Sequence, residues 1–197
     1  MKLYFALIKQ LLLIRSLFLI LTNVGRSVLI CEIDSYNIVI YVRKSFFFSF
    51  SLFLKYHYYT RYQQLTEIVC VDYPQRANRF SLSYLFLSCF YNVRVACVCL
   101  TDALGSMVSL VSLFAGSNWL EREVWDMFGI MFVYHPDLRR ILTDYGFLGH
   151  PLRKDFPLSG FVEVYFNDMT QLVCYQSLSL AQEFRDYGRI QNPWHLN

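Results

Sequence analysis

Apolar runs bounded by turn signals indicate a small β-sheet in the middle of the chain. Residues 37–42 form a continuous apolar run of the length expected for a buried strand. Residues 67–73 form a second predicted strand, which proline ends at the next position. Residues 79–90 and 93–100 read as two further strands with a tight connection, so we predict a β-hairpin there.

Two apolar segments near the N-terminus are predicted to be helical. Residues 3–21 are mostly Leu, Ile and Phe, and polar residues recur every seven positions as one narrow helical stripe: Lys2, Lys9, Ser16 and Asn23. We expect this helix to be covered by protein. A membrane span is the alternative, although a charge at mid-membrane costs roughly 2.5–3.5 kcal/mol. The aromatic segment 45–57 is ambiguous between helix and strand, and its context favours a helix.

A short helix is predicted at residues 118–128. Asn118 stands where an N-cap is expected, and Glu121 has the spacing of its partner in a capping box. Gly129 is placed to end the helix. Gly and Pro then recur at short intervals, which disfavours long helices and predicts an extended segment over residues 131–197, here named the C-terminal arm.

The predicted fold class is therefore α+β. N-terminal helices and a small mixed or antiparallel sheet form a domain over residues 1–130, and the C-terminal arm, 131–197, follows it and docks on partner subunits. Residues 161–166 are a candidate strand within that arm.

Composition and charge narrow the classes of function. Hydrophobic residues make up 55% of the chain and the mean hydropathy is +0.32, both high for a protein that stands alone. Residues 1–61 hold eight Lys and Arg against two acidic residues, whereas residues 121–168 hold five basic against eight acidic residues. The net charge of +3, without a stripe of Lys and Arg, argues against a nucleic-acid partner. The six cysteines lack the spacing of a zinc site or cluster, so we expect mostly buried free thiols.

The helix at 118–128 mixes charged and aromatic side chains, which is typical of an interface but also fits a solvated charged face. Arg122 and Asp126 lie one turn apart and are predicted to pair. The predicted interface residues of this segment are Trp119, Glu121, Arg122, Glu123, Trp125, Asp126 and Phe128.

The arm contains two similar segments, residues 135–140 and 150–155. Each begins with a His-Pro turn and contains two adjacent basic residues and one aspartate. Their predicted interface residues are His135, Asp137, Arg139, Arg140, His150, Arg153, Lys154 and Asp155. Arginine forks suit carboxylates or carbonyls of a partner, and a segment broken by prolines has few internal partners for its polar groups. An anionic-ligand site on the four basic residues is an alternative, and a metal site would need ligands beyond the two histidines. No nucleophile–base pair or paired carboxylates point to catalysis, so we expect no catalytic, cofactor-binding or metal site.

Residues 118–130, 135–147 and 150–157 resemble the thirty-kilodalton subunit family of respiratory complex I, which is called NADH dehydrogenase subunit 9 where a mitochondrial genome encodes it. The resemblance is dense over about fifty residues, and is looser at the predicted sheet. Residues 1–60 and those after 170 match poorly.

That resemblance implies a non-catalytic subunit in the peripheral arm of a proton-pumping NADH:ubiquinone oxidoreductase, on the matrix side of the mitochondrial inner membrane. Its chief partner would be the forty-nine-kilodalton subunit beside the quinone-reducing module. FMN, iron–sulfur clusters and quinone would reside on other subunits, with no cofactor on this chain. The alternatives are the equivalent subunit of a membrane-bound hydrogenase, a small protein anchored in the membrane by residues 3–21, and an independent enzyme that uses the arginine cluster.

Overall fold

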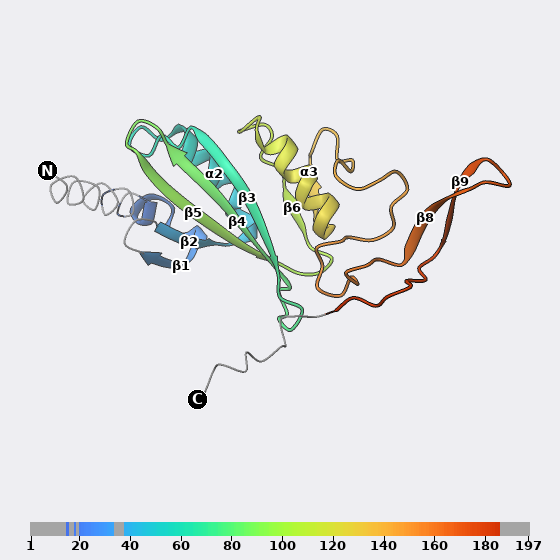
Figure 1. The fold of residues 1–197 in the computed structure, drawn as a ribbon. Helices are drawn as coiled ribbons and strands as arrows, with labels where there is room; N and C mark the ends of the chain where they lie inside the picture. The colour runs from blue at the N-terminus through green and yellow to red at the C-terminus, as the bar shows by residue number, and fades with distance from the viewer. Residues whose placement is uncertain (1–14, 16–17, 19, 34–37, 186–197) are drawn as a thin grey trace, which may run out of the picture. The chain divides into compact units, whose positions relative to one another are not determined.

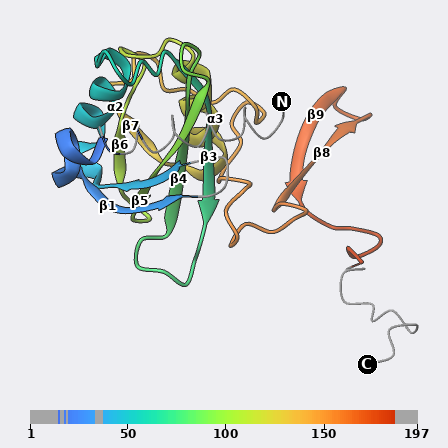
Figure 2. The same ribbon diagram turned by 90° about the vertical axis from the view of Figure 1, so that its left-hand side faces the viewer.

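The computed structural model of the chain describes residues 15, 18, 20–33 and 38–185. The chain divides into two compact units, Met1–Lys154 and Asp155–Asn197. We name residues 131–154 the proximal arm and residues 155–197 the distal arm. Figures 1 and 2 show the elements from two directions.

A five-stranded mixed sheet is the centre of the first unit. Its strand order is β1-β2-β5-β4-β3, with β2 and β5 parallel and every other pair antiparallel. The strands are β1 (Val28–Ile33), β2 (Ile38–Val42), β3 (Gln64–Asp72), β4 (Phe80–Ser88) and β5 (Val93–Thr101). The α+β class with a mixed sheet is confirmed, as are the predicted strands at 37–42, 67–73, 79–90 and 93–100.

One face of this sheet contributes side chains to the core. Residues in β4 alternate between buried and half-buried, so Leu82, Tyr84 and Phe86 all point into the core. Helix α2 (Phe47–Tyr56), preceded by the 3-10 turn η2 (Lys44–Phe46), buries Phe47 and Leu54 on one side. The rings of Phe47 and Tyr84 lie 4.4 Å apart, which joins the helix to the sheet and confirms the helix expected at 45–57.

The chain upstream of the sheet is described in part. Residues 20–24 are helical and lead into the 3-10 turn η1 (Gly25–Ser27), and Ile20 is buried in the core. Most of the helix predicted at 3–21 lies outside the described residues. Within the described part of the chain, no helix has the length and apolar character needed to cross a membrane.

Helix α3 (Ser117–Phe128) lies between two short strands, β6 (Ser106–Val108) and β7 (Met131–Val133), which pair in parallel. Neither strand was predicted, since three residues are too few for a recognisable alternation. α3 packs beside β3, and Phe128 meets Phe80 edge-on with ring centroids 6.2 Å apart.

The proximal arm folds with the first unit. The first compact unit extends to Lys154, since β7 pairs with β6 and the Lys154 N–H donates to Asp72. The division into a domain over residues 1–130 and an arm over 131–197 stays a prediction. Residues 155–185, the described part of the distal arm, contain an antiparallel hairpin of β8 (Val162–Asn167) with β9 (Leu172–Ser177). β8 confirms the candidate strand at 161–166, whereas β9 was not predicted.

Candidate functional site: a partner-binding surface on helix α3 and the proximal arm

Helix α3 begins without the predicted capping box. Its N-cap is Gly116, no side chain caps it, and Asn118 lies inside the first turn. Glu121 instead turns into the core, where its carboxylate accepts hydrogen bonds from the Ser109 hydroxyl at 2.6 Å and the Leu110 N–H at 2.7 Å. The prediction was wrong because two donors after β6 outcompete the local N–H groups for this carboxylate.

Glu121 is a fully buried carboxyl group. Burial raises its pKa to about 7, although hydrogen bonds from Ser109, Leu110 and Ser117 counteract part of that effect. His135 Nε2 lies 3.9 Å from the carboxylate, also shielded from solvent. Because His135 Nδ1 accepts the Asp137 N–H at 3.1 Å, we assign the ring proton to Nε2, which donates to the Asn118 carbonyl at 3.3 Å. His135 therefore fastens the arm to the start of α3.

Asp126 organises the middle of the proximal arm. Its carboxylate accepts the backbone N–H groups of three consecutive arm residues, Ile141, Leu142 and Thr143, at 3.2, 2.7 and 2.9 Å. The Thr143 hydroxyl donates at 2.7 Å and Arg140 Nη1 at 3.3 Å. Burial by itself raises the pKa of Asp126, but these donors outweigh it and hold the pKa below its ordinary value.

The predicted pair of Arg122 with Asp126 is therefore wrong. Arg122 Nε donates to the Arg139 carbonyl at 3.1 Å, and its guanidinium lies 5.8 Å from the centre of the Trp119 ring. The spacing of one helical turn would allow an ion pair, but the Asp126 carboxylate already accepts five hydrogen bonds from the proximal arm.

The second His-Pro segment, residues 150–153, binds the C-terminal end of α3. Gly129 adopts the left-handed conformation (φ 73°), as the predicted stop requires. The last backbone carbonyls of the helix accept hydrogen bonds from the arm. The Asp126 carbonyl accepts from His150 Nδ1 at 3.1 Å, and the Met127 carbonyl accepts from the Leu152 N–H at 3.1 Å. The Phe128 carbonyl accepts from Arg153 Nε at 2.6 Å. A positive guanidinium at this end also complements the helix dipole.

Two aromatic contacts complete this end of the helix. His150 meets Trp125 edge-on, with ring centroids 5.8 Å apart, and Arg153 lies over Phe80. Burial lowers the pKa of His150, and the neighbouring positive charges of Arg153 and Arg140 add to that effect. His150 therefore works as a neutral structural donor.

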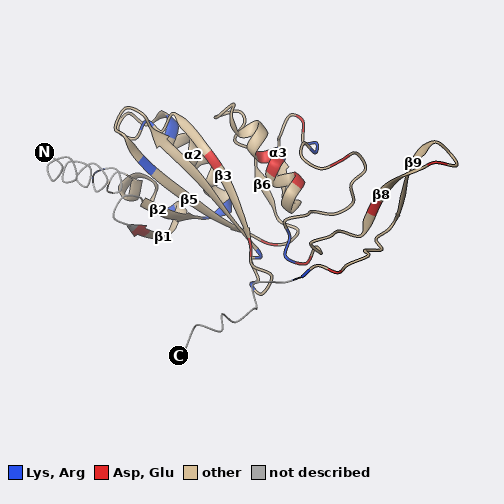
Figure 3. Cartoon of the chain, viewed as in Figure 1, with Lys and Arg blue, Asp and Glu red and all other residues tan. Residues whose placement is uncertain are grey.

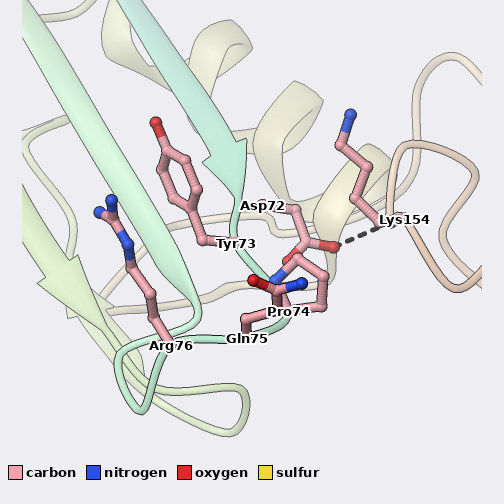
Figure 4. Close-up of a pocket in the computed structure, with 6 residues that line it drawn as sticks. All are labelled: Asp72, Tyr73, Pro74, Gln75, Arg76 and Lys154. Carbon is pink, nitrogen blue, oxygen red and sulfur yellow. Dashed lines mark hydrogen bonds between the residues drawn. The ribbon is translucent and has the colours of Figure 1, made fainter.

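Asp72, at the end of β3, ties the proximal arm to the sheet. Arg79 binds both of its oxygens at 2.7 Å, and the Lys154 N–H donates to one of them at 2.9 Å. The hydrogen bond from Arg79 is the main reason why the pKa of Asp72 lies below its ordinary value. A hollow of about 400 Å³ lies beside it, lined by the β3–β4 turn and Lys154. Figure 4 shows the residues that line it. In that turn Arg76 stacks over Tyr73 at 4.2 Å.

Arg140 and Arg153 depart from the expected pattern of external partners. Arg140 also donates to the Gly149 carbonyl at 2.8 Å, so both side chains use carbonyls or carboxylates of this chain. The prolines prevent regular secondary structure in the arm, but its polar groups form hydrogen bonds with α3 instead of with another subunit. The predicted residues that lie exposed are Trp119, Glu123, Asp137, Arg139, Lys154 and Asp155. Figure 3 shows the acidic residues of α3 in red.

The interface residues predicted from the sequence did not include the exposed apolar side chains of the proximal arm. The exposed fractions of Tyr134, Tyr145 and Leu148 are 87%, 97% and 83%, and those of Leu142 and Leu152 exceed one half. With the 57% exposed Trp119 they form a set that we name the arm surface. For Tyr145, Leu148 and Leu152 the sequence signal is a large apolar residue directly beside Gly or Pro, where no core strand or helix can bury it. Exposed apolar groups on an internally bonded support are typical of protein interfaces.

Thiol, imidazole and carboxylate side chains are the groups that bind metal ions and iron–sulfur clusters. All six cysteines are described and free, and the buried Cys97 and Cys99 have pKa values raised by burial. Among the residues that the structure describes, no three His, Cys, Asp or Glu side chains are grouped to hold a metal ion. An iron–sulfur cluster requires four thiolate or imidazole ligands, which these residues do not bring together.

The fold and the site define an α+β domain whose helix α3 and proximal arm expose large apolar side chains on an internally hydrogen-bonded support. The model of the family described as Respiratory-chain NADH dehydrogenase, 30 Kd subunit, matches residues 40–162, and the chain belongs to this family. NADH dehydrogenase (ubiquinone) iron-sulfur protein 3 of Oryza sativa subsp. japonica is 51% identical over 154 residues, 78% of this chain and 80% of that protein. NADH-ubiquinone oxidoreductase subunit 9 of Prototheca wickerhamii is 48% identical over the same shares of both chains.

A solved structure shares the fold. A chain of the membrane-bound sulfane sulfur reductase, an archaeal respiratory membrane complex, superposes with a TM-score of 0.63 at 19% identity, covering 72% of this chain and 84% of that chain. At this identity the likeness concerns the fold alone.

Proposed function

We propose that the chain is a structural and assembly subunit in the peripheral arm of proton-pumping NADH:ubiquinone oxidoreductase, where the arm surface binds the forty-nine-kilodalton subunit near the quinone-reducing module. Family membership supports the complex, and the exposed apolar side chains of the arm surface support the docking role. The plant and algal relatives support a mitochondrial location, on the matrix side of the inner membrane.

The arm surface is the observation that carries this proposal. Its apolar side chains stand on a support fixed by Asp126, His150 and Arg153, so the ordering of the loop is already complete before a partner arrives. Preorganisation of this kind reduces the entropic cost of binding. The exposed side chain of Lys154 is open to acidic groups of the partner. Arg139 is also exposed, and its surface pair with Asp137 at 2.9 Å is weak enough to exchange for a partner's carboxylate.

We further propose that this chain carries no cofactor and no active site of its own. FMN, iron–sulfur clusters and quinone belong to other subunits of the complex, and so do electron transfer and proton translocation. The support is the scattered placement of the cysteines and the use of Glu121, Asp126 and His150 in internal hydrogen bonds. Elemental analysis and visible absorption of the complex, with ligands mapped by residue, test this; iron or flavin bound to this chain contradicts it.

Assembly measurements with Leu148→Asp test the docking role. Leu148 is 83% exposed, so a charge there leaves the fold unchanged but buries an unpaired carboxylate in the interface. We expect the yield of complex, measured by native gel and mass spectrometry, to fall roughly tenfold. Leu104→Asp is the control, because Leu104 is fully exposed in the β5–β6 turn; it should assemble as the parent does.

The same gels identify the partner. An amine-reactive crosslinker on Lys154 should join this chain to the forty-nine-kilodalton subunit. A Leu148→Asp complex that forms at normal yield and has lost turnover would show instead that the surface holds a catalytic or ligand-binding group.

A further inference from the structure

An arginine enclosed by exposed aromatic rings lies at the other end of β3 from the proximal arm. The guanidinium of Arg61, in the loop between α2 and β3, lies 4.4 Å from the ring centre of Tyr58 and 4.9 Å from that of Phe90 in the β4–β5 turn. Tyr58 and Phe90 are 64% and 66% exposed, and Tyr59 beside them is also exposed. We name Tyr58, Tyr59, Arg61, Phe90 and Tyr91 the aromatic–arginine patch.

The patch is firmly anchored. The buried Thr60 hydroxyl donates to the Leu54 carbonyl at 2.9 Å, and the Arg61 N–H donates to the His57 carbonyl at 3.1 Å. Tyr91 packs edge-on against Phe90, with centroids 4.9 Å apart, and its hydroxyl donates to the Tyr58 carbonyl at 3.5 Å. The two loops are thereby joined, and the rings are held in place before any partner arrives.

The backbone at Arg61 is strained. Its φ of 45° lies in the left-handed region that glycine adopts freely and a long side chain adopts at a cost. The backbone conformation at this position therefore favours glycine over arginine. Residues held in this way concentrate where a side chain must be presented for binding.

In the two segments that carry the patch the charged residues are all basic, and the nearest acidic residue in the sequence is Glu67 on β3. Residues 38–66 and 89–101 contain five basic residues, Arg43, Lys44, Lys55, Arg61 and Arg94, and no Asp or Glu. Arg61 has no carboxylate partner among the residues that the structure describes. A guanidinium stacked between rings keeps its edge free for two parallel hydrogen bonds to a carboxylate.

We propose that the aromatic–arginine patch is a second docking surface, which binds an acidic polypeptide segment of a neighbouring subunit through a carboxylate on Arg61 and apolar side chains on Tyr58 and Phe90. Tyr and Arg together are the residues that dominate protein interfaces. Two guanidinium groups meet the rings of this patch: Arg61 lies between Tyr58 and Phe90, and Arg15 lies 5.2 Å from the ring centre of Tyr59. A nucleic-acid backbone or an anionic membrane needs a longer row of free cations. β3 separates it from Asp72 by nine residues, roughly 27 Å along the strand, so it engages a different surface from the arm.

A photocrosslinking experiment in the assembled complex tests the patch. Tyr58 is replaced by p-benzoylphenylalanine in the full-length chain, the purified complex is irradiated, and the adducts are identified by mass spectrometry. The expected adduct joins this position to a peptide of another subunit that carries Asp or Glu within a few residues. An adduct with lipid, with nucleic acid, with an acid-free peptide or with this chain, or no adduct at all, overturns the proposal.

Substitutions of Arg61 separate binding from folding. Arg61→Gly relieves the backbone strain and should keep the loop, yet it should lower the adduct per assembled complex about tenfold, the loss expected for a hydrogen-bonded charge. Arg61→Glu should do the same, and Arg43→Glu, an exposed arginine without flanking rings, should leave the adduct unchanged. An undiminished adduct in Arg61→Gly overturns the proposal. If the unsubstituted chain does not co-migrate with the complex, the proposed function itself fails; if it does and the adduct is missing, only the patch proposal fails.

Discussion

At the scale of single residues, three buried carboxyl groups are stabilised in two different ways. Asp72 and Asp126 each receive several donors, including backbone N–H groups of the proximal arm, and their pKa values lie below the ordinary range. Glu121 receives hydrogen bonds from three neutral donors, burial outweighs them, and its pKa rises to about 7. The first two therefore hold the arm as anions, whereas Glu121 changes its protonation state near neutral pH.

Glu121 should make the packing of α3 against β6 sensitive to pH. Because its pKa is about 7 in the fold against 4.5 for the free group, its stabilising contribution is complete below pH 4.5 and is lost as pH rises through 7. The shift corresponds to roughly 3 kcal/mol. In Glu121→Gln this loss should disappear. The hydrogen-exchange rate of α3 in the variant complex, divided by the rate in the parent complex at the same pH, should therefore fall between pH 5 and pH 8. A ratio that is the same at both pH values would contradict this.

Asp126 should control the order of the proximal arm. Asp126→Ala removes the acceptor of five hydrogen bonds and leaves Arg140 half-buried without its carboxylate, a change of roughly 3–5 kcal/mol. We expect trypsin to cut after Arg139 and Arg140 much faster than in the parent. Asp137→Ala is the matched control, because Asp137 and Arg139 form an exposed pair worth about 0–1 kcal/mol. Equal cleavage of both variants would show that the network does not hold the arm.

The sequence indicated that Glu121 and Asp126 belong to the site, but it did not predict their hydrogen-bond partners. The sequence placed Glu121 in a capping box and Asp126 in a pair with Arg122, because local spacing is all that a sequence displays directly. The actual partners, Ser109 and Thr143, lie 12 and 17 positions away and meet these carboxylates only in the folded chain. Gly129 was predicted correctly because a left-handed helix end is a local requirement.

At the scale of elements, the sheet was predictable where the strands are long. β4 and β5 each run for nine residues, with an apolar face that makes their period visible. β6 and β7 have three residues each and form only because α3 brings them together. β9 lies in a polar and apolar mixture with both faces exposed, so no periodic signal marks it.

The end of α3 offers a test at this scale. A Cβ on Gly129 would lie 2.4 Å from His150 Nε2 and 2.6 Å from Arg153 Nη2, and φ is +73°. Gly129→Ala should therefore displace the second His-Pro segment and destabilise the chain by about 1–3 kcal/mol. Gly116→Ala, at the other end of the helix with nothing within 4 Å of the added carbon, should be nearly neutral. The melting temperature of the complex measures both, and equal shifts would refute the role given to the helix end.

At the scale of the whole molecule, the chain has a well-packed core and more exposed apolar surface than a free monomer needs. The arm surface and the aromatic–arginine patch expose large side chains in the first unit. In the distal arm the β8–β9 hairpin exposes Val164, Phe166 and Leu172 among others. A lone two-stranded hairpin is marginally stable in water, so this unit also requires a covering partner.

The full-length chain should therefore self-associate when it is produced without its partners. Exposed apolar patches of this size are tolerated in an assembly but drive association of the isolated protein. Gel filtration with light scattering should show oligomers or aggregates, and the exchange of deuterium into residues 162–177 should be fast. Co-production with the subunit that crosslinks to Lys154 should yield a stoichiometric complex in which those residues are protected. A monodisperse monomer that melts cooperatively by itself would show that the exposed surfaces are not interfaces, and would remove the main support for the docking role.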